Sequence, residues 1–590
     1  MTAIPAHPSA ASTPGRPAET SAWEPLRNPV FRTLWIASFV ANIGTWMQTV
    51  GAQWFLLDHH SGSATVAFVQ AAASLPVLLL TLPAGVLAEF VDRRRLLVGV
   101  QAFQAATGSL LAALTLTGRM TPGLLLAFTF LLGAGAAVQL PAYQAFIPAL
   151  VPRSQLGAAA SLSSLGVNLA RAVGPAIAGV LVTSVGTGGL FVLNAASFVV
   201  FAVALVTTRA PTGLRQRSAG FLNGLEAGGR YVRNAPTVRR ILLRLVLFAA
   251  PANILWTLLP LVAREQLHMG AAGYGILLAA AGVGAVAGAV AAPRIRARLS
   301  PTALLTASGL VYGAGMLALG VTHSPAVAIV VLLPTGVAWI IVIAGLNAAV
   351  QSFLPAWVRA RALSIYQVVL FTTFAVSAVV WGIVAQETSL ADSFYLAGVL
   401  LIVGAVAGLR WPLRSSTPGQ RAELVYWPEP TAPIAADDLS APVQVIIGYA
   451  VEPGQRAAFL TAMAGLRRSR LRTGAFRWEL YQDPADSSRY IEQFEVDSWE
   501  DHLEQHRDRL TADDHDFQQR VDSAARAVEP ARHITRQMLG DERLLLRPVA
   551  SFQRARRRQR PGQRWSAMPR WAAKRSKTGI GRVATTASGV

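Results

Sequence analysis

The sequence predicts an all-α membrane protein of twelve transmembrane helices in two six-helix repeats, followed by a small α+β domain. Three observations lead to this prediction. Hydrophobic residues make up 53% of the 590 residues and charged residues only 14%, against about 25% charged in an ordinary soluble domain. The apolar residues form long blocks separated by short polar segments. The first six blocks also resemble the last six, as described below.

A transmembrane helix needs about 20 apolar residues to cross about 30 Å of hydrocarbon. We expect six spans before a longer polar loop and six after it. The expected spans are residues 33–57, 64–89, 96–117, 122–148, 156–184, 189–208, 241–263, 271–293, 302–322, 325–353, 362–386 and 391–410. These divide the helical part into bundles at 27–208 and 241–412.

The N-terminal segment, residues 1–26, is rich in Pro, Ala, Ser and Thr. It has no basic start followed by an apolar core, so we expect a disordered cytoplasmic tail and not a cleaved signal peptide. The chain contains no cysteine, which excludes disulfides, thiol nucleophiles and cysteine-ligated metal sites.

Basic residues are distributed unequally between the two sides of the membrane. One side carries only Arg119 and Arg264. The other carries Arg27, Arg32, Arg93 to Arg95, Arg153, the loop 209–240, Arg294, Arg296, Arg298, Arg359, Arg361, Arg410 and Arg414. Because cytoplasmic loops collect Lys and Arg, we expect both termini and the central loop in the cytoplasm and the protein in the inner (cytoplasmic) membrane.

The central loop, residues 209–240, has apolar residues set among Arg and Gly. This pattern is compatible with an interfacial amphipathic helix and equally with a solvated linker. Its apolar residues are Phe221, Leu222, Leu225, Tyr231 and Val232.

The two halves share an internal repeat. The fourth span ends in Gln144-Ala-Phe-Ile-Pro-Ala-Leu-Val151 and the tenth in Gln351-Ser-Phe-Leu-Pro-Ala-Trp-Val358, with Gln, Phe, Pro, Ala and Val matching at one constant offset. A weaker sequence match relates the segment from Asn42 to Trp46 in the first span to the segment from Asn253 to Trp256 in the seventh. Parallel six-helix repeats with a binding site between them describe one large transporter architecture.

The loop between the second and third spans reads Gly85-Val-Leu-Ala-Glu89-Phe-Val-Asp92-Arg93-Arg94-Arg95. It resembles the cytoplasmic loop motif of the major facilitator superfamily, and the resemblance covers about residues 25–412. It implies that Gly85 permits close helix packing and that Glu89 or Asp92 pairs with the arginines as a cytoplasmic latch. The alternative is that the arginines only enforce topology.

A second motif, Gly174-Pro175-Ala-Ile-Ala178-Gly179, resembles the antiporter signature of the superfamily's exporters, with Ala178 in place of a glycine. Small residues and a proline allow tight packing and a kink; ordinary helix packing is the alternative. Together with the loop motif it favours export over uptake. A third, partial match is Gly133-Ala-Gly-Ala-Ala137 in the fourth span, which resembles the end of another exporter motif. The arginine of that motif is replaced by Thr129, so the resemblance does not imply proton coupling through that position.

Asn168-Leu-Ala-Arg171-Ala-Val-Gly174-Pro175, with the arginine loop, resembles the transmembrane secretion effector branch, which includes siderophore exporters and drug or macrolide efflux proteins. The resemblance implies a secondary active exporter of a drug, siderophore or secondary metabolite working by alternating access, with no enzymatic activity and no cofactor. A membrane-anchored enzyme or sensor is the alternative.

Arg171 is the only charge well inside an expected span. A charge there is costly and indicates function by default. We consider two roles: binding an anionic substrate or a carboxylate, and hydrogen bonding to carbonyls around the Pro175 kink.

In the superfamily the first, fourth, seventh and tenth helices line the cavity. Carried onto this chain, this implies a mostly amide and aromatic lining that suits an amphipathic substrate, although some members would only hydrogen-bond between helices. The candidates are Asn42, Trp46, Gln48, Gln139, Tyr143, Gln144, Asn253, Trp256, Asn347 and Gln351. If protons drive export, Glu89, Asp58 or the substrate itself must carry them.

A Pro-rich linker, 413–442, leads to a domain at 443–528. Strand, helix, strand, strand and helix patterns follow in order, which suggests a ferredoxin-like domain. It resembles antibiotic-biosynthesis-monooxygenase-like domains, which implies that the chain can dimerise through this sheet. We favour a regulatory, docking or dimerisation module over an enzyme. His502 and His506 share a helix face, as in metal-binding helices, but we interpret that face as solvated.

The final segment, residues 529–590, carries most of the chain's net charge of +21. We expect a disordered tail that binds anionic membrane lipid in preference to nucleic acid.

Overall fold

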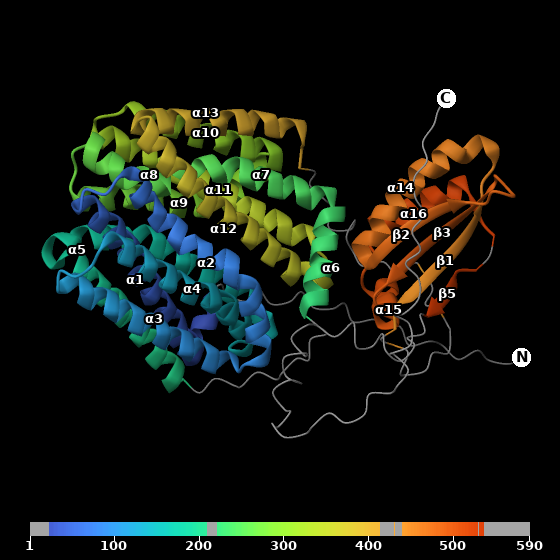
Figure 1. Cartoon of the computed structure of the whole chain (residues 1–590), viewed down its shortest axis with the longest axis horizontal. Helices are drawn as coiled ribbons and strands as arrows, with labels where there is room; N and C mark the ends of the chain where they lie inside the picture. Colours follow the sequence, from blue (N-terminus) through green and yellow to red (C-terminus); the bar gives the residue numbers. More distant parts are fainter. Residues whose placement is uncertain are drawn as a thin grey trace, which may run out of the picture.

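The computed structural model describes residues 23–208, 221–413, 427, 430, 439, 441–528 and 530–535, without the side chains of 81–90, 145, 153, 221–225, 356 and 360. The predictions for Gly85 and Glu89, for most of the two tails and for most of the linker lie outside the described residues and side chains. Figure 1 shows a large helical body and, beside it, a smaller domain of strands and helices.

Between residues 23 and 208 the structure has five α-helices: α1 (Pro29–Asp58), α2 (Ser63–Phe90), α3 (Arg93–Leu116), α4 (Pro122–Phe146) and α5 (Leu156–Thr207). Local sequence determines where three of them, α1, α3 and α4, begin. Asn28, Asp92 and Thr121 each accept a hydrogen bond from a backbone N–H of the following first turn, and α1 and α4 start with proline. Such caps satisfy backbone donors that have no partner within the helix.

Helix α5 includes both the fifth and the sixth expected spans. An unbroken helix of 52 residues would be about 78 Å long, more than twice the hydrocarbon thickness. The break is at Gly186, whose φ of 68° and ψ of 178° are not helical. Glycine adopts a positive φ without the steric cost that a Cβ imposes, so Gly186 separates the two expected spans.

The second half begins with α6 (Phe221–Asn234) in the central loop. The helices after it are α7 (Pro236–Ala252), α8 (Ile254–Leu261), a π-helical turn η4 (Val262–Gln266), α9 (Ala271–Arg298), α10 (Pro301–Val321), α11 (Pro325–Phe353), α12 (Ala356–Glu387) and α13 (Leu390–Ala407).

Within the described residues, ten helices are long and apolar enough to cross a membrane. In this count α5 is one helix, and α7, α8 and η4 together form one stretch. Helix α1 is not among the ten; it carries polar residues such as Gln48 and Gln53 along its length. The multi-pass helical membrane fold is confirmed, and the count of twelve stays a prediction.

The two halves pack through α5 against α9 and α2 against α12. Glycines permit this close approach. A Cβ on Gly179 would lie 2.8 Å from the Cα of Gly275, and a Cβ on Gly382 would lie 3.0 Å from the Cα of Ala64. Small residues at such crossings are typical of membrane helices, where packing rather than the hydrophobic effect holds helices together.

The C-terminal domain begins with the predicted order of strand, helix, strand, strand and helix, but the last helix is divided in two and two short strands follow it. The second of these strands, at residues 532–535, lies in the segment that we expected to be a disordered tail, and it forms because it pairs with the distant first strand. The parts of the domain are β1 (Val443–Ala450), α14 (Arg456–Thr473), β2 (Ala475–Gln482), β3 (Arg489–Val496), α15 (Trp499–Arg507), α16 (Ala512–Ala524), β4 (Arg526–Ala527) and β5 (Arg532–Thr535). The antiparallel strands run β2-β3-β1-β4, and β5 also pairs with β1. Alternate residues of β1 are buried, because successive side chains point to opposite faces and helices cover one face.

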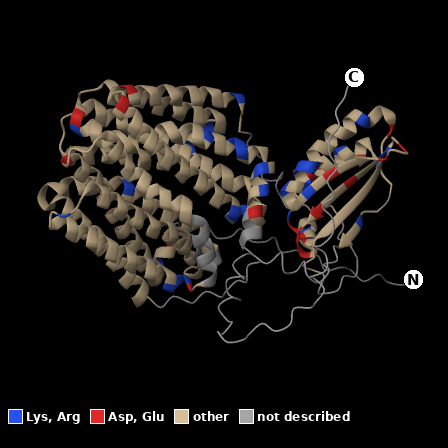
Figure 2. Cartoon of the chain, viewed as in Figure 1, with Lys and Arg blue, Asp and Glu red and all other residues tan. Residues whose placement is uncertain are grey.

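Helix α6 lies between the helical body and this domain, in contact with α12 and α14 (Figure 1). Arg230 Nη2 of α6 lies 2.8 Å from Asp497 Oδ2, and the Arg509 guanidinium lies 4.7 Å from the centre of the Trp357 ring. Of the two interpretations of the central loop, a helix is present. Figure 2 shows that charged residues are sparse within the helical body and frequent in the domain.

Candidate functional site

The two halves are joined where α1 ends, at the side that the charge distribution predicts to be external. Tyr274 Oη of α9 donates a 2.5 Å hydrogen bond to Gln53 Oε1. Gln53 Nε2 in turn donates to the backbone oxygen of Trp256, 3.2 Å away. Gln53 and Tyr274 are both buried, so each satisfies a polar group that would otherwise be costly to bury.

An ion pair lies beyond these hydrogen bonds, nearer the end of the helices. Arg264 Nη1 is 3.0 Å from Asp58 Oδ1, and both side chains are partly exposed, so the pair contributes at most about 1 kcal/mol. We refer to Gln53, Asp58, Arg264 and Tyr274 as the outer gate. Sequence reasoning missed Gln53 and Tyr274, because nothing in the local pattern pairs α1 with α9.

Three predicted site residues meet below the outer gate. The Trp46 and Trp256 rings, one from each half, have centroids 5.9 Å apart. The Arg171 guanidinium lies 5.7 Å from the centre of the Trp46 ring, within cation–π range. Gly174 makes room for this contact, since a Cβ there would lie 2.7 Å from Trp46 Cβ.

The Arg171 Nε atom is buried and has no hydrogen-bond partner among the described residues. Within the same part of the chain, the structure contains no hydrogen bond from Arg171 to the carbonyls around Pro175. A buried donor without an acceptor costs about 1–3 kcal/mol. Arg171 Nε is therefore a buried hydrogen-bond donor without an acceptor in the described part of the chain, next to the Trp46 and Trp256 rings.

Aromatic residues continue this region into the second half. The Trp339 ring lies 5.4 Å from Trp256 and 6.0 Å from Phe374. The indole Nε1 atoms of Trp256 and Trp339 are also buried without a partner in the described part of the chain. Sequence reasoning missed Trp339, although it lies on the tenth span, which the resemblance placed at the cavity.

Other candidates form hydrogen bonds within and between helices. Asn253 Nδ2 donates to Phe374 O at 3.1 Å and to Ser377 Oγ at 3.0 Å. Gln48 Oε1 accepts from Asn194 at 2.6 Å. Asn42 Nδ2 donates to Ser38 O, one turn earlier in its own helix.

The remaining candidates lie toward the other end of the bundle, where α4 and α11 finish. Tyr143 packs edge-on against Phe201 with centroids 5.8 Å apart. Gln144 is exposed and Gln139 half-buried. Gln351, also exposed, donates to Asn347 of the same helix. The structure thus separates the predicted set into a group around Arg171, a group in hydrogen bonds within and between helices, and a group at this end.

The described part of the loop motif makes contacts within the first half. Asp92 caps α3 by accepting from Arg95 N at 2.9 Å. Arg94 donates from Nε to Leu205 O at 2.7 Å and from Nη2 to Val206 O at 2.6 Å, which satisfies carbonyls at the end of α5. Arg93 is half-buried.

The antiporter-like motif packs between α1 and α9. Gly174 contacts Trp46 as described, and Gly179 faces Gly275. A Cβ on Gly275 would lie 2.7 Å from Pro175 O, so the proline's turn also lies against α9. The motif therefore holds Arg171 close to both halves.

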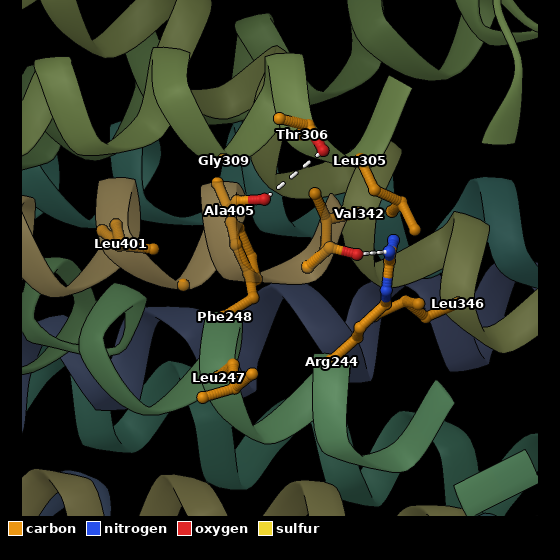
Figure 3. A pocket seen from close by; sticks show the side chains of 12 residues that line it. Arg244, Leu247, Phe248, Leu305, Thr306, Gly309, Val342, Leu346, Leu401 and Ala405 are labelled. Atoms are coloured by element: carbon orange, nitrogen blue, oxygen red, sulfur yellow. Dashed lines mark hydrogen bonds between the residues drawn. The ribbon is translucent and has the colours of Figure 1, made fainter. Parts of the chain in front are cut away.

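A cavity in the second half has a different character. Figure 3 shows Arg244 beside Leu305, Val342 and Leu346. Arg244 is buried and donates to Gly408 O and, at 2.8 Å, to Trp411 O. It satisfies carbonyls at the end of α13, where a cation also complements the helix dipole. Arg244 therefore has a structural role that sequence reasoning missed.

The solvated face predicted for His502 and His506 is wrong. Their side chains are 0% and 2% exposed, and their Nε2 atoms lie 3.3 Å apart. The reason is tertiary: α15 turns this face toward β3, and Trp427 of the linker stacks on His506 with centroids 4.3 Å apart. Burial, with smaller effects from His506 and His533, lowers the pKa of His502 to about 3.

Comparison with known proteins covers both parts of the chain. Residues 20–544 match the model of the transmembrane secretion effector family, a range that includes the C-terminal domain.

Three relatives are transporters by name. The chain is 23% identical to the staphyloferrin A transporter of Staphylococcus aureus over 48% of this chain and 71% of the relative. It is 28% identical to the multidrug efflux pump Tap of Mycobacterium tuberculosis over 48% of this chain and 70% of the relative. It is 22% identical to macrolide efflux protein A of Streptococcus pyogenes over 40% of this chain and 60% of the relative.

Two solved structures share the fold of the helical part. The nucleoside transporter NupG has a TM-score of 0.53 at 13% identity, covering 65% of this chain and 98% of that one. The second is a bacterial homologue of the human lysosomal transporter Spinster in an inward-facing, unoccupied conformation. It has a TM-score of 0.54 at 16% identity and covers 66% of this chain and 97% of that one. At these identities the likeness concerns the fold alone.

Proposed function

We propose, from the premise that the chain belongs to the transmembrane secretion effector family of the major facilitator superfamily, that its substrate binds at Arg171 between the two halves. The chain is a multi-pass membrane transporter that exports small molecules. The observation that carries the proposal is the buried Arg171 Nε, which has no hydrogen-bond partner among the described residues, in a guanidinium that lies over Trp46 next to Trp256 and below the outer gate.

We propose that this arrangement is the inward-facing state of an alternating-access cycle in the cytoplasmic membrane, with both termini in the cytoplasm. The hydrogen bonds of Gln53 and the Arg264–Asp58 pair then close the external side. Substrate enters from the cytoplasm, past Gln144 and Gln351. Release outside requires these contacts to break while the cytoplasmic side closes, for which Glu89 or Asp92 with Arg93 and Arg94 is our candidate latch.

The proposed substrate presents hydrogen-bond acceptors, carries negative charge and has an apolar or aromatic part. Arg171 supplies a positive charge that is expensive inside a membrane unless a partner compensates it. Trp256 and Trp339 supply two further unpaired donors and flat apolar surface. A site with donors and aromatic faces selects a ligand with complementary acceptors.

The residue that couples transport to protons is not identified by the motifs. Related exporters have an arginine associated with proton coupling at the position where this chain has Thr129. The candidates for a coupling proton stay Glu89, Asp58 and the substrate itself. Asp58 is already paired with Arg264 in the outer gate, so its protonation would weaken the gate.

The experiment is uptake into inside-out vesicles, in which export appears as accumulation. An anionic aromatic dye and a cationic dye of similar size are compared for wild type, Arg171→Ala and Arg171→Lys at equal membrane levels. We expect Arg171→Ala to abolish accumulation of the anion and Arg171→Lys to retain part of it. Wild-type accumulation of the anion by Arg171→Ala would reject the site.

For the C-terminal domain we propose a regulatory or docking role and no enzymatic activity. Its contacts with α6 and α12 through Asp497 and Arg509 support docking. Dimerisation through the sheet and binding of anionic lipid by residues 529–590 are further parts of this proposal. If a chain that ends at residue 412 transports substrate at the same rate and with the same regulation as the full chain, the regulatory role of the domain is rejected.

A further inference from the structure

The C-terminal domain has an unusually polar interior for its size. Arg470 and Glu492 are 1% and 0% exposed, and Arg470 Nε lies 3.2 Å from Glu492 Oε1. Tyr449 Oη donates to Glu492 Oε2 at 2.9 Å and Trp478 Nε1 donates to Glu492 Oε1 at 2.8 Å. Burial, followed by the charge of Glu492, raises the pKa of Tyr449.

Stability does not explain this cluster. A buried ion pair is often neutral or destabilising relative to apolar residues of the same volume, and a small domain has little core with which to offset the loss. The buried pair His502 and His506 adds more polar groups beside it. Buried titratable groups gathered in one place are typical of functional sites.

A residue from outside the domain fills the space beside the cluster. Two flat groups contact the Trp427 ring: the Arg470 guanidinium lies 4.1 Å from its centre, and the His506 ring stacks on it with centroids 4.3 Å apart and an interplanar angle of 24°. Phe494 and His502 border it at 6.3 and 6.2 Å. Trp427 belongs to the linker that follows α13, not to any strand or helix of the domain.

We propose that the slot between Arg470 and His506 is a binding site for a planar, electron-rich aromatic small molecule, and that Trp427 occupies it as an internal competitor. A guanidinium over an aromatic face is attractive by about 0.5–1 kcal/mol at exposed sites and by about 2 kcal/mol or more when desolvated, and the His506 ring adds a stacking contact. A hydroxyl or N–H on the ligand edge meets Glu492 or His502 as acceptor.

The position of the slot links it to the transporter. Helix α15, which carries His502 and His506, is flanked by Asp497 and Arg509, the residues that contact Arg230 of α6 and Trp357 of α12. The linker that carries Trp427 continues from the last helix of the membrane part. A ligand that displaces Trp427 thus acts next to these two contacts between the domain and the helical body. This inference is independent of the substrate site at Arg171.

The test uses the absence of cysteine from the chain. In the full-length protein in lipid nanodiscs, Trp427→Cys empties the slot and places one thiol at its entrance. Trp411→Cys, at an exposed tryptophan outside the domain, is the matched control. The rate of maleimide labelling is measured with 2-naphthol, which is planar and aromatic, and with decahydro-2-naphthol, which has the same skeleton without π electrons.

We expect 2-naphthol to slow labelling of Trp427→Cys at least tenfold, decahydro-2-naphthol to slow it less than twofold, and neither to affect Trp411→Cys. Adding Arg470→Lys, which keeps the charge and removes the flat guanidinium, should abolish the preference for 2-naphthol. Equal protection by both alcohols, or protection by neither, would overturn the proposal.

A milder variant covers the case in which Trp427→Cys does not fold. Trp427→Phe keeps an aromatic ring of smaller area in the slot. By calorimetry it must bind 2-naphthol more tightly than wild type, because its competing side chain is weaker. Equal affinity in the two proteins would also overturn the proposal.

Discussion

Tyr274 donates a short hydrogen bond to Gln53, and this bond connects α9 of the second half to α1 of the first. Gln53 is held at the same time to the backbone of α8 through Trp256 O. One buried amide thus ties two helices of the second half to the first half. Weakening it should favour the state in which the halves separate on this side.

The first prediction concerns Tyr274→Phe. Loss of one buried hydrogen bond of about 1 kcal/mol should shift the balance toward the outward-open state by about fivefold. A cysteine at Thr49, between Trp46 and Gln53 on α1, should be labelled correspondingly faster by an impermeant maleimide added outside. Tyr395→Phe, at an exposed tyrosine of α13, should leave the rate unchanged. Equal rates in both variants would remove Tyr274 from the gate.

The second prediction concerns the unpaired indoles. Trp256→Phe and Trp339→Phe each keep an aromatic ring and remove an N–H donor. If the substrate accepts this hydrogen bond, its apparent KM in inside-out vesicles should rise about tenfold, corresponding to about 1.4 kcal/mol, with little change in maximal rate. Trp381→Phe is the control, because its Nε1 is already bonded to Ala250 O. An unchanged KM in both site variants would show that neither N–H contacts substrate.

The third prediction concerns the crossing of α5 and α9. In Gly179→Val the added side chain meets the Gly275 backbone, 2.8 Å from the new Cβ, and backbone cannot move aside cheaply. We expect loss of most transport and a lower melting temperature of the purified protein. Gly157→Val, on the same helix with open space around its Cβ, is the matched control. Normal transport by Gly179→Val would mean that this close approach is dispensable.

The fourth prediction concerns docking of the C-terminal domain. Asp497→Arg places a positive charge against Arg230, so hydrogen exchange in α6 and α15 should rise. The exchanged pair Arg230→Asp with Asp497→Arg should restore protection, since it restores the ion pair. Because the original pair is partly exposed, its free energy is about 1 kcal/mol or less. Arg477→Asp, which changes an exposed side chain on β2, should leave hydrogen exchange in α6 unchanged.

The fifth prediction is a pH dependence. His502 has a folded-state pKa of about 3, below its unfolded value of about 6.5, so the unfolded state binds the proton more readily. The resulting stability is present above pH 6.5 and is lost as the pH falls toward 3. The groups facing His502 are His506, His533 and Arg470. Protection of β3 and α15 amides against exchange, measured on the full chain, should therefore fall below pH 6.

The matched variants for that prediction are His502→Gln and His515→Gln. Substituting the buried His502 should flatten the pH dependence of protection between pH 6 and 4. Substituting His515, half-exposed on α16, should leave it as in wild type. If both variants keep the wild-type profile, another group is responsible for it.

Much of the fold was predictable because it depends on local pattern. Apolar blocks of the right length marked the helices, and alternation marked β1. The order of elements in the C-terminal domain followed from the same signals. Arg171 stood out because a charge within an apolar block is rare. In contrast, the choice between a solvated linker and a helix at Phe221 to Asn234 depended on α12 and α14, which lie far away in the sequence.

Contacts between distant segments decided the rest. The sequence by itself determined a helical membrane body with a charged residue inside it and a separate α+β domain, since hydropathy and periodicity are properties of neighbouring residues. Only the tertiary structure paired Gln53 with Tyr274, brought Trp339 beside Trp256, and buried His502 and His506 under Trp427. These outcomes depend on which helix faces are opposed, and no local window of sequence contains both partners.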